Sequence, residues 1–456
     1  MSSPSAAQRD DSAAPAGYRN PGARSWIALL LIIHFVYGTA PDLSPAHRLD
    51  IYLIGSVLFA ALLAACLSVL VLPARLEVTG LSIEPLFRQT LLLIVAVAFA
   101  IYTAFPDRFA AILILAFLSV QLPLLWRSMY RASLAATGCA IIGGLAVVIL
   151  RTRLADLGAD MLPVCVWANH ILLQHANPYL ADHRSVTPWP FFYLPLQWLI
   201  YMPLVLLHAD VRWLNLASVI GTLALLFWNR RNLANPWLAL TLMLVFIVSR
   251  PSTEMLYQGE VWPFWFMISA FSVLLLRGKP ARAALALGGL LGISQTAIHI
   301  AGLTAVWRLR SAGKWYRTLL MGALAAGVYF ISIIPFAHGI VAFIRNEYVV
   351  LPHLAGRLVQ RVRDHRDTEV SLANLLLHLG LIRWRMAIQL TVVLSTAAVL
   401  AVRRAGTRAF LYLTGVSYLA AISLNMQVWK YYYGPGLLLM FWSIVWTPAP
   451  PNPALP

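Results

Sequence analysis

The sequence predicts an all-α membrane protein that crosses the bilayer about 14 times. Of the 456 residues 60% are hydrophobic and only 11% are charged, whereas about 25% are charged in an ordinary soluble domain. Apolar runs long enough to cross a bilayer recur from Trp26 almost to the C-terminus, since roughly 20 helical residues cover a hydrocarbon core about 30 Å thick. In lipid the backbone must satisfy its own hydrogen bonds, so we expect these runs to be helices.

The two ends of the chain are polar or rich in proline. Residues 1–25 predict a disordered tail and residues 449–456 a short Pro-rich tail, both cytoplasmic. The first apolar run has no convincing signal-peptide cleavage site, so we expect a retained helix. The net charge of +17 lies in short clusters between apolar runs, and no polar domain presents a basic face for nucleic acid. We interpret the three cysteines as small apolar residues.

Five spans precede the first long polar stretch. They are predicted at about 26–41, 50–72, 88–105, 109–125 and 134–150. A cytoplasmic N-terminus places Arg75, Arg88, Arg127 and Arg131 inside, as the positive-inside rule requires. The first four spans, within 26–130, are then additional to a core over 131–448, and the stretch from Arg151 to Pro190 is a large outer loop.

The apolar segment 191–208 has the length of a span but carries Pro195 and Pro203. If it crossed the membrane, Arg230 and Arg231 would lie outside and most later basic loops would be inverted. We therefore predict an interfacial or re-entrant helix.

The later spans are predicted at about 212–228, 236–249, 262–276, 317–337, 384–402, 407–424 and 431–448. Between them, 283–307 has basic loops at both of its ends, so it must leave the cytoplasmic side and return. The sequence predicts two short helices here, bent around the polar stretch 292–297.

The first outer loop carries Asp156 and Asp160, which are four residues apart and would share a helix face. A partly buried carboxylate can accept a proton from a substrate hydroxyl. The alternative is a pair of solvated acids. His170, His175 and His183 follow, but the ligand spacing of a zinc site is absent, so we predict no metal.

Two further outer segments are rich in polar side chains. The turn Gln258-Gly259-Glu260 offers hydrogen-bond donors and acceptors between two spans, although a tight interhelical turn needs no function. The outer loop 338–383 gathers arginines where the charge rule disfavours them, which indicates a phosphate partner, or else pairing with acids of the same loop. The four central arginines are Arg357, Arg361, Arg363 and Arg366.

The order of motifs resembles a known family. An Asp after a span is followed by Asn-Pro-Tyr at 177–179, Phe-Tyr-x-Pro-Leu at 192–196, Leu-x-Gln-Gly at 256–259, a pair of short helices with small residues, Ser-Leu-x-x-Leu-Leu at 371–376 and Trp-x-Tyr-Tyr at 429–432. From about Gly143 to Trp446 the chain is similar to the membrane-integral C superfamily (GT-C) of polyprenyl-phosphate-sugar-dependent glycosyltransferases, and most resembles the α-mannosyltransferases of glycosyltransferase family 87.

The resemblance implies site residues. Asp160 corresponds to the family's catalytic aspartate, and His353 or His365 to a histidine that its long outer loop supplies; His338 is a further candidate. The family's Gly-Gln-x-Asn is replaced by Gly259-Glu260-Val261-Trp262, and its lysine by Gln295. From residues and resemblance together, the candidate substrate-binding set is Asp156, Asn177, Tyr179, Tyr193, Gln258, Glu260, Gln295, Arg357, Arg361, Arg363, Arg366, Trp429 and Tyr432.

The implied reaction moves a sugar, mannose or a related hexose or pentose, from a polyprenyl phosphate to a lipid or glycan acceptor on the outer face of the inner (plasma) membrane. Asp160 would deprotonate the acceptor in a single inverting displacement, with arginines at the departing phosphate. No cofactor is expected. The alternative is a multispanning transporter or lipid flippase, although neither an internal repeat nor a charge well inside a span is found.

Overall fold

The regular secondary structure of the described residues is helical, with turns and irregular segments between the helices. The computed structural model describes residues 27–33, 45–68, 94, 97, 117–124, 126, 127, 129–154, 161–187, 191, 193–311, 315–345, 370–403, 405–425 and 430–447. No strand occurs in these residues, only one isolated β-bridge between Leu233 and Trp446. The all-α class is confirmed for this part of the chain.

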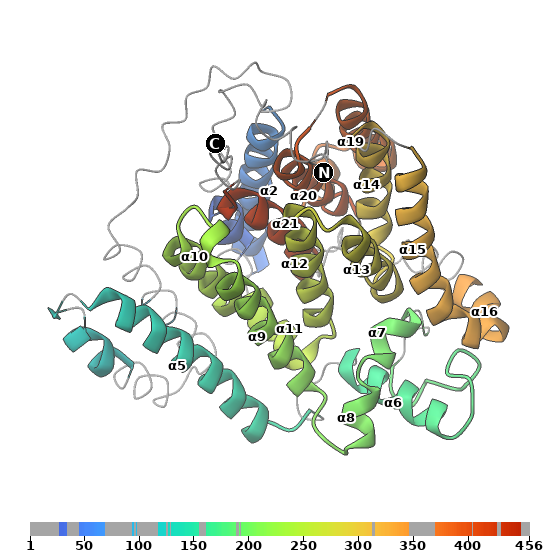
Figure 1. Cartoon of the computed structure of the whole chain (residues 1–456), viewed down its shortest axis with the longest axis horizontal. Helices are drawn as coiled ribbons and strands as arrows, with labels where there is room; N and C mark the ends of the chain where they lie inside the picture. Colours follow the sequence, from blue (N-terminus) through green and yellow to red (C-terminus); the bar gives the residue numbers. More distant parts are fainter. Residues whose placement is uncertain are drawn as a thin grey trace, which may run out of the picture.

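Short helices of five to nine residues are interspersed among longer ones (Figure 1). In chain order the helices are α2 (Pro45–Ser68), α5 (Tyr130–Arg151), α6 (Met161–Leu173), α7 (Pro195–Leu199), α8 (Met202–Leu206), α9 (Arg212–Trp228), α10 (Pro236–Val248), α11 (Arg250–Gln258), α12 (Trp262–Leu276), α13 (Pro280–Ile293), α14 (Ala297–Ser311), α15 (Trp315–Ile333), α16 (Ile340–Arg345), α18 (Leu372–His378), α19 (Arg385–Val402), α20 (Thr407–Ile422) and α21 (Gly434–Val445). The 3-10 helices are η4 (Arg230–Asn232), η5 (Ile334–Gly339), η7 (Ile382–Trp384) and η8 (Lys430–Tyr433).

The centre of the bundle is built from α12, α13, α20 and α21, with α9 against α12 and α15 against α13 (Figure 1). Small residues let these helices approach closely, as is typical of helix packing in membranes. A Cβ atom added at Gly415 would lie 2.7 Å from the carbonyl oxygen of Gly436, so α20 and α21 touch through their backbones.

Three helical segments are long and apolar enough to cross a membrane: Arg131–Arg151, Trp315–Gly339 and Ile382–Val402. A fourth is possible if α10 and α11, which are bent by 60° at Ser249, together form one span. The expected count of about 14 spans is not confirmed. The other described apolar helices are mostly 12–17 residues long, which is below the usual length of a span, and several carry a proline in the first turn, as at Pro236, Pro263 and Pro435.

The two predicted interruptions are present. Segment 191–208 forms two five-residue helices, α7 and α8, with prolines in their first turns. Even as one straight helix, the twelve residues Pro195–Leu206 would cover only about 18 Å, which is too short for a bilayer core. Segment 283–307 lies in α13 and α14, which are separated at 294–296.

The segments that the charge rule places inside meet at one end of the bundle. Arg277 donates to Asn229 (2.6 Å), Trp307 donates to the Ala405 carbonyl (2.8 Å) and Arg408 donates to the Ser443 carbonyl (3.0 Å). The short helices α6, α7, α8 and α16 lie at the opposite end, at the bottom of Figure 1.

The N-terminal helix α2 packs on the core and does not stand apart from it. It contacts α18 and α20, and the Ser56 hydroxyl accepts a hydrogen bond from the Ser371 backbone N–H (3.1 Å). The Phe59 ring lies 5.2 Å from the ring of Tyr433. At least one of the predicted additional helices therefore supports η8.

Candidate functional site

Aromatic side chains form a separate apolar cluster at the end of the bundle where α6, α7 and α8 lie. Phe336 of η5 packs on Trp198 (5.2 Å between ring centroids) and on Tyr179 (5.9 Å). The Tyr179 hydroxyl donates to the Tyr193 carbonyl (2.7 Å) and accepts from the Trp198 indole N–H (3.5 Å). The cluster fixes the entry into α7, and burial raises the pKa of Tyr179, which keeps its hydroxyl a donor.

A buried carboxylate lies beside this cluster. Glu260 is 4% exposed and follows Gly259, where α11 has ended and α12 has not yet begun. The Gln197 side-chain N–H donates to it (2.9 Å), and the Gln197 side-chain oxygen accepts from the Leu194 backbone N–H (3.3 Å). The start of α7 and the α11–α12 joint are therefore tied together through a charge-assisted hydrogen bond.

Several tyrosines extend this polar region into the bundle. Tyr431 of η8 is buried near Glu260 and Tyr193, whose charges would raise its pKa. Its ring centroid is 4.6 Å from that of Tyr432. Tyr418 lies within electrostatic range of Tyr432, and its hydroxyl donates to Thr296 (2.9 Å) in the joint between α13 and α14.

Four helix interruptions thus meet: the start of α7, the α11–α12 joint, the α13–α14 joint and η8. Gly292 allows one close approach, since a Cβ there would lie 2.5 Å from the Leu196 side chain of α7. Backbone groups at such interruptions lack helical partners. Carboxylate, amide and hydroxyl groups together can bind a polyhydroxylated ligand.

Burial keeps two neighbours of Glu260 uncharged. Desolvation raises the pKa of the Cys165 thiol and of the Tyr201 hydroxyl, and the charge on Glu260 raises both further. The thiol is therefore not a thiolate nucleophile at neutral pH. Cys165 lies one helical turn beyond Met161, the first residue of α6, and Met161 directly follows Asp160 in sequence.

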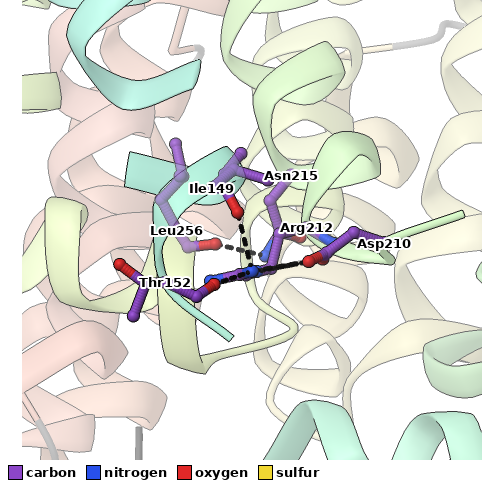
Figure 2. Close-up of polar contacts among 6 residues, drawn as sticks. All are labelled: Ile149, Thr152, Asp210, Arg212, Asn215 and Leu256. Carbon is purple, nitrogen blue, oxygen red and sulfur yellow. Dashed lines mark hydrogen bonds and ion pairs between the residues drawn. The ribbon is translucent and has the colours of Figure 1, made fainter. Parts of the chain in front are cut away.

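The first turn of α9 joins two further elements, as Figure 2 shows. The Arg212 guanidinium pairs with Asp210 (2.5 Å) and donates to the carbonyls of Ile149 (3.0 Å) and Thr152 (2.5 Å) at the end of α5. Asn215 donates to the carbonyls of Leu256 (3.0 Å) and Gly259 (2.7 Å) at the end of α11. Its side-chain oxygen accepts from the Tyr201 hydroxyl (2.8 Å).

The structure brings some of the predicted residues together. Tyr193, Glu260 and Tyr432 border one polar region through Tyr431, and Gln295 precedes Thr296 at its far edge. Gln258 ends α11. Asn177 lies apart, because its side chain accepts from the Tyr179 backbone N–H (3.0 Å) in the aromatic cluster. Asp156, Asp160, His353, His365, Arg357, Arg361, Arg363, Arg366 and Trp429 lie outside the described residues.

Sequence reasoning missed Gln197, Arg212 and Asn215. It quoted the motif at 429–432, which contains Tyr431, but selected only Trp429 and Tyr432 from it. One signal was available: Gln197 is the only strongly polar side chain in the apolar segment 191–206. The spacing of Arg212 and Asn215, three residues apart on one helix face, is a second signal. No group of three or more metal-ligating side chains occurs among the residues described above.

Comparison of the chain with known protein families, with curated proteins and with solved structures finds no match. The fold defines an all-helical protein with apolar helices that could cross a membrane. Function therefore has to be argued from the residues of the site.

Proposed function

We propose that the chain is a membrane-integral glycosyltransferase of the inner (plasma) membrane that transfers a sugar, mannose or a related hexose or pentose, from a polyprenyl-phosphate donor to a lipid or glycan acceptor. The site faces the periplasm or exterior. The helices are embedded in the lipid bilayer, and the proposed reaction uses neither a nucleic acid nor a cofactor.

One observation carries the proposal: three segments that are widely separated in sequence and carry Tyr193, Glu260 and Tyr432 meet inside an apolar bundle. Gln197 links Glu260 to the residue after Tyr193, and η8, which contains Tyr432, packs against α11 just before Glu260. Tyr193, Glu260 and Tyr432 are three of the positions that the motif order selected independently of any structure. A polar region of this kind is costly among apolar helices unless it has a ligand or a structural task.

The chemistry of the region suits a sugar. A carboxylate and an amide accept and donate to vicinal hydroxyls, while aromatic rings such as Tyr431 and Tyr432 can cover the apolar face of a pyranose. Asp160, next to the start of α6, would take the acceptor proton during attack on the anomeric carbon. The bond from that carbon to the phosphate oxygen breaks, the lipid phosphate leaves with the electron pair, and the configuration inverts.

The test is an incubation of the purified full-length protein with radiolabelled polyprenyl-phosphate sugars and total membrane lipids. We expect label to move into a new lipid- or glycan-linked product from one lipid-phosphate donor and from no nucleotide sugar. If no sugar were transferred from any lipid-phosphate donor, the proposed function would be wrong.

A second candidate function is transport or flipping of a lipid. The interruptions at 294–296 and at Ser249 favour it, because transporters build substrate sites from broken helices. Movement of a fluorescent polyprenyl phosphate across proteoliposome membranes, without formation of a product, would support this second function over the first.

A further inference from the structure

Three polar residues at the start of α9 make hydrogen bonds that connect two chain segments, the ends of α5 and α11, which lead into the proposed site. We name Asp210, Arg212 and Asn215 the α9 clamp. Arg212 is 1% exposed and its guanidinium is oriented by Asp210, whose two oxygens accept from the Arg212 side chain at 2.5–3.1 Å. In this orientation the guanidinium donates to the carbonyls of Ile149 and Thr152 at the end of α5 (Figure 2).

The first segment held is the end of α5. The carbonyls of Ile149 and Thr152 belong to the last turn, where helix carbonyls lack intrahelical partners and favour a cationic donor. Thr152 precedes Asp156 and Asp160 by four and eight residues. Arg212 therefore fixes the point from which the acidic stretch departs.

The second segment held is the end of α11. Asn215 lies three residues after Arg212, on the same face of α9, and is fully buried. Its amide donates to Leu256 and Gly259, and Glu260 is the next residue. Through its oxygen it also holds Tyr201, which follows α7.

We infer that the α9 clamp positions the site: it sets the separation between the segment that leads to Asp160 and the joint that carries Glu260. The inference rests on the proposed function, because it assigns these residues to the same reaction. Arg212 and Asn215 act through the groups they hold and are not assigned contact with substrate.

The opposite end of α9 supplies a matched control. Asn229 is also almost fully buried, donates to the Leu225 carbonyl (2.6 Å) and accepts from Arg277 (2.6 Å). Like Asn215 it accepts a hydrogen bond from a side chain of another segment, but it leads into no candidate site residue. Asn229→Ala removes two hydrogen bonds at the end of α9, and Asn215→Ala removes four near its start.

The experiment compares Asn215→Ala with Asn229→Ala in the full-length protein in lipid nanodiscs, with Tyr201→Phe as a milder variant should Asn215→Ala not fold. The first readout is the split between kcat and KM for the lipid-phosphate donor. The second is the distance distribution between spin labels at positions 153 and 253, in a Cys139→Ser background, since Cys66 and Cys165 are buried.

We expect Asn215→Ala to lower kcat by about 10-fold or more while the donor KM changes less than about threefold, because misplacement of reacting groups costs rate and not uniform binding. The distance distribution should broaden. Asn229→Ala should leave both readouts as in the wild type. Tyr201→Phe should lower kcat in the same direction by a smaller factor.

A folded Asn215→Ala protein with unchanged distances and kcat would overturn the inference, and so would an equal loss of kcat in Asn229→Ala. A wild-type protein without transfer activity would instead overturn the proposed function. The spin-label distances would then still decide whether the clamp sets the separation of the two segments.

Discussion

Asp160 is the side chain on which the proposed chemistry depends most. Replacement by Asn keeps its size and removes the base, so turnover should fall by about 10² or more, the usual range of general-base catalysis. Donor binding and folding should survive. The measurement is the initial rate of sugar transfer by purified variants at saturating donor.

Asp156→Asn serves as the comparison at the same scale, since this acid is four residues nearer in sequence to Arg151 and Arg153, with which we expect it to pair. It should cost much less than Asp160→Asn. If Asp160→Asn kept near-full activity and Asp156→Asn lost it, Asp156 would be the base. If neither substitution lowered the rate, the proposed transferase would have no identified general base.

Tyr179 makes a prediction about stability and pH. Burial raises the pKa of Tyr179 above its ordinary value of about 10, so the folded state holds the proton to higher pH than the unfolded state. Stability from this group is therefore present below about pH 10 and is lost above it, at about 1.4 kcal/mol per pH unit. Tyr179→Phe should be less stable at neutral pH by about 1–3 kcal/mol, because the Tyr193 carbonyl loses its donor, and should lack this alkaline loss.

Unfolding of both proteins in detergent from pH 7 to pH 11 tests this, with the difference between them as the readout. A constant difference in stability over the whole pH range would show that Tyr179 keeps its ordinary pKa.

At the scale of residues, sequence reasoning identified polar residues in turns but did not identify their structural contacts. The Asn177 side chain accepts from the Tyr179 backbone N–H and the Tyr179 hydroxyl donates to the Tyr193 carbonyl, which are local tasks that the sequence did not show, and their contact with substrate stays a prediction.

At the scale of elements, glycines set the distance between helices. A Cβ at Gly288 would lie 2.5 Å from the Ala325 carbonyl, so Gly288→Ala should push α13 from α15 and destabilise the protein by about 1–3 kcal/mol. Gly322→Ala, on α15 with nothing within 4 Å of its Cβ, should be neutral or slightly stabilising, since alanine is the better helix former.

Thermal unfolding of the two alanine variants in the same detergent is the measurement. Equal unfolding midpoints would mean that α13 and α15 do not pack as closely as described.

The helix interruptions could be predicted from the sequence, because prolines at 195 and 203 and the polar stretch 292–297 are local signals. Helix lengths could not, because a long apolar run does not show where tertiary packing bends or ends a helix, as at Ser249.

At the scale of the whole molecule, the topology can be tested at Arg230. This residue lies at the end of the bundle where the Asn229–Arg277 and Trp307–Ala405 contacts join the basic loops. In a Cys139→Ser background, a cysteine at 230 should react with a membrane-impermeant reagent only after the cytoplasmic side is opened. Reaction in intact cells would invert the topology and place the proposed site inside.

The all-α class followed from composition and hydrophobic runs, which are whole-chain properties. The sequence did not predict which joints approach each other in space. Tyr193, Glu260 and Tyr432 come from three separate joints, and no local pattern encodes that these joints meet. The arrangement depends on buried contacts such as Gln197 with Glu260 and Leu196 with Gly292, which only the folded bundle reveals.

The most direct measurement places the wild-type protein in proteoliposomes with a polyprenyl-phosphate sugar labelled in the sugar and, in a parallel sample, in the lipid. Transferase activity predicts that the sugar label moves to the acceptor with inverted anomeric configuration, while the polyprenyl phosphate is released. Movement of both labels together to the other leaflet, with the sugar still attached to its phosphate, would contradict the account.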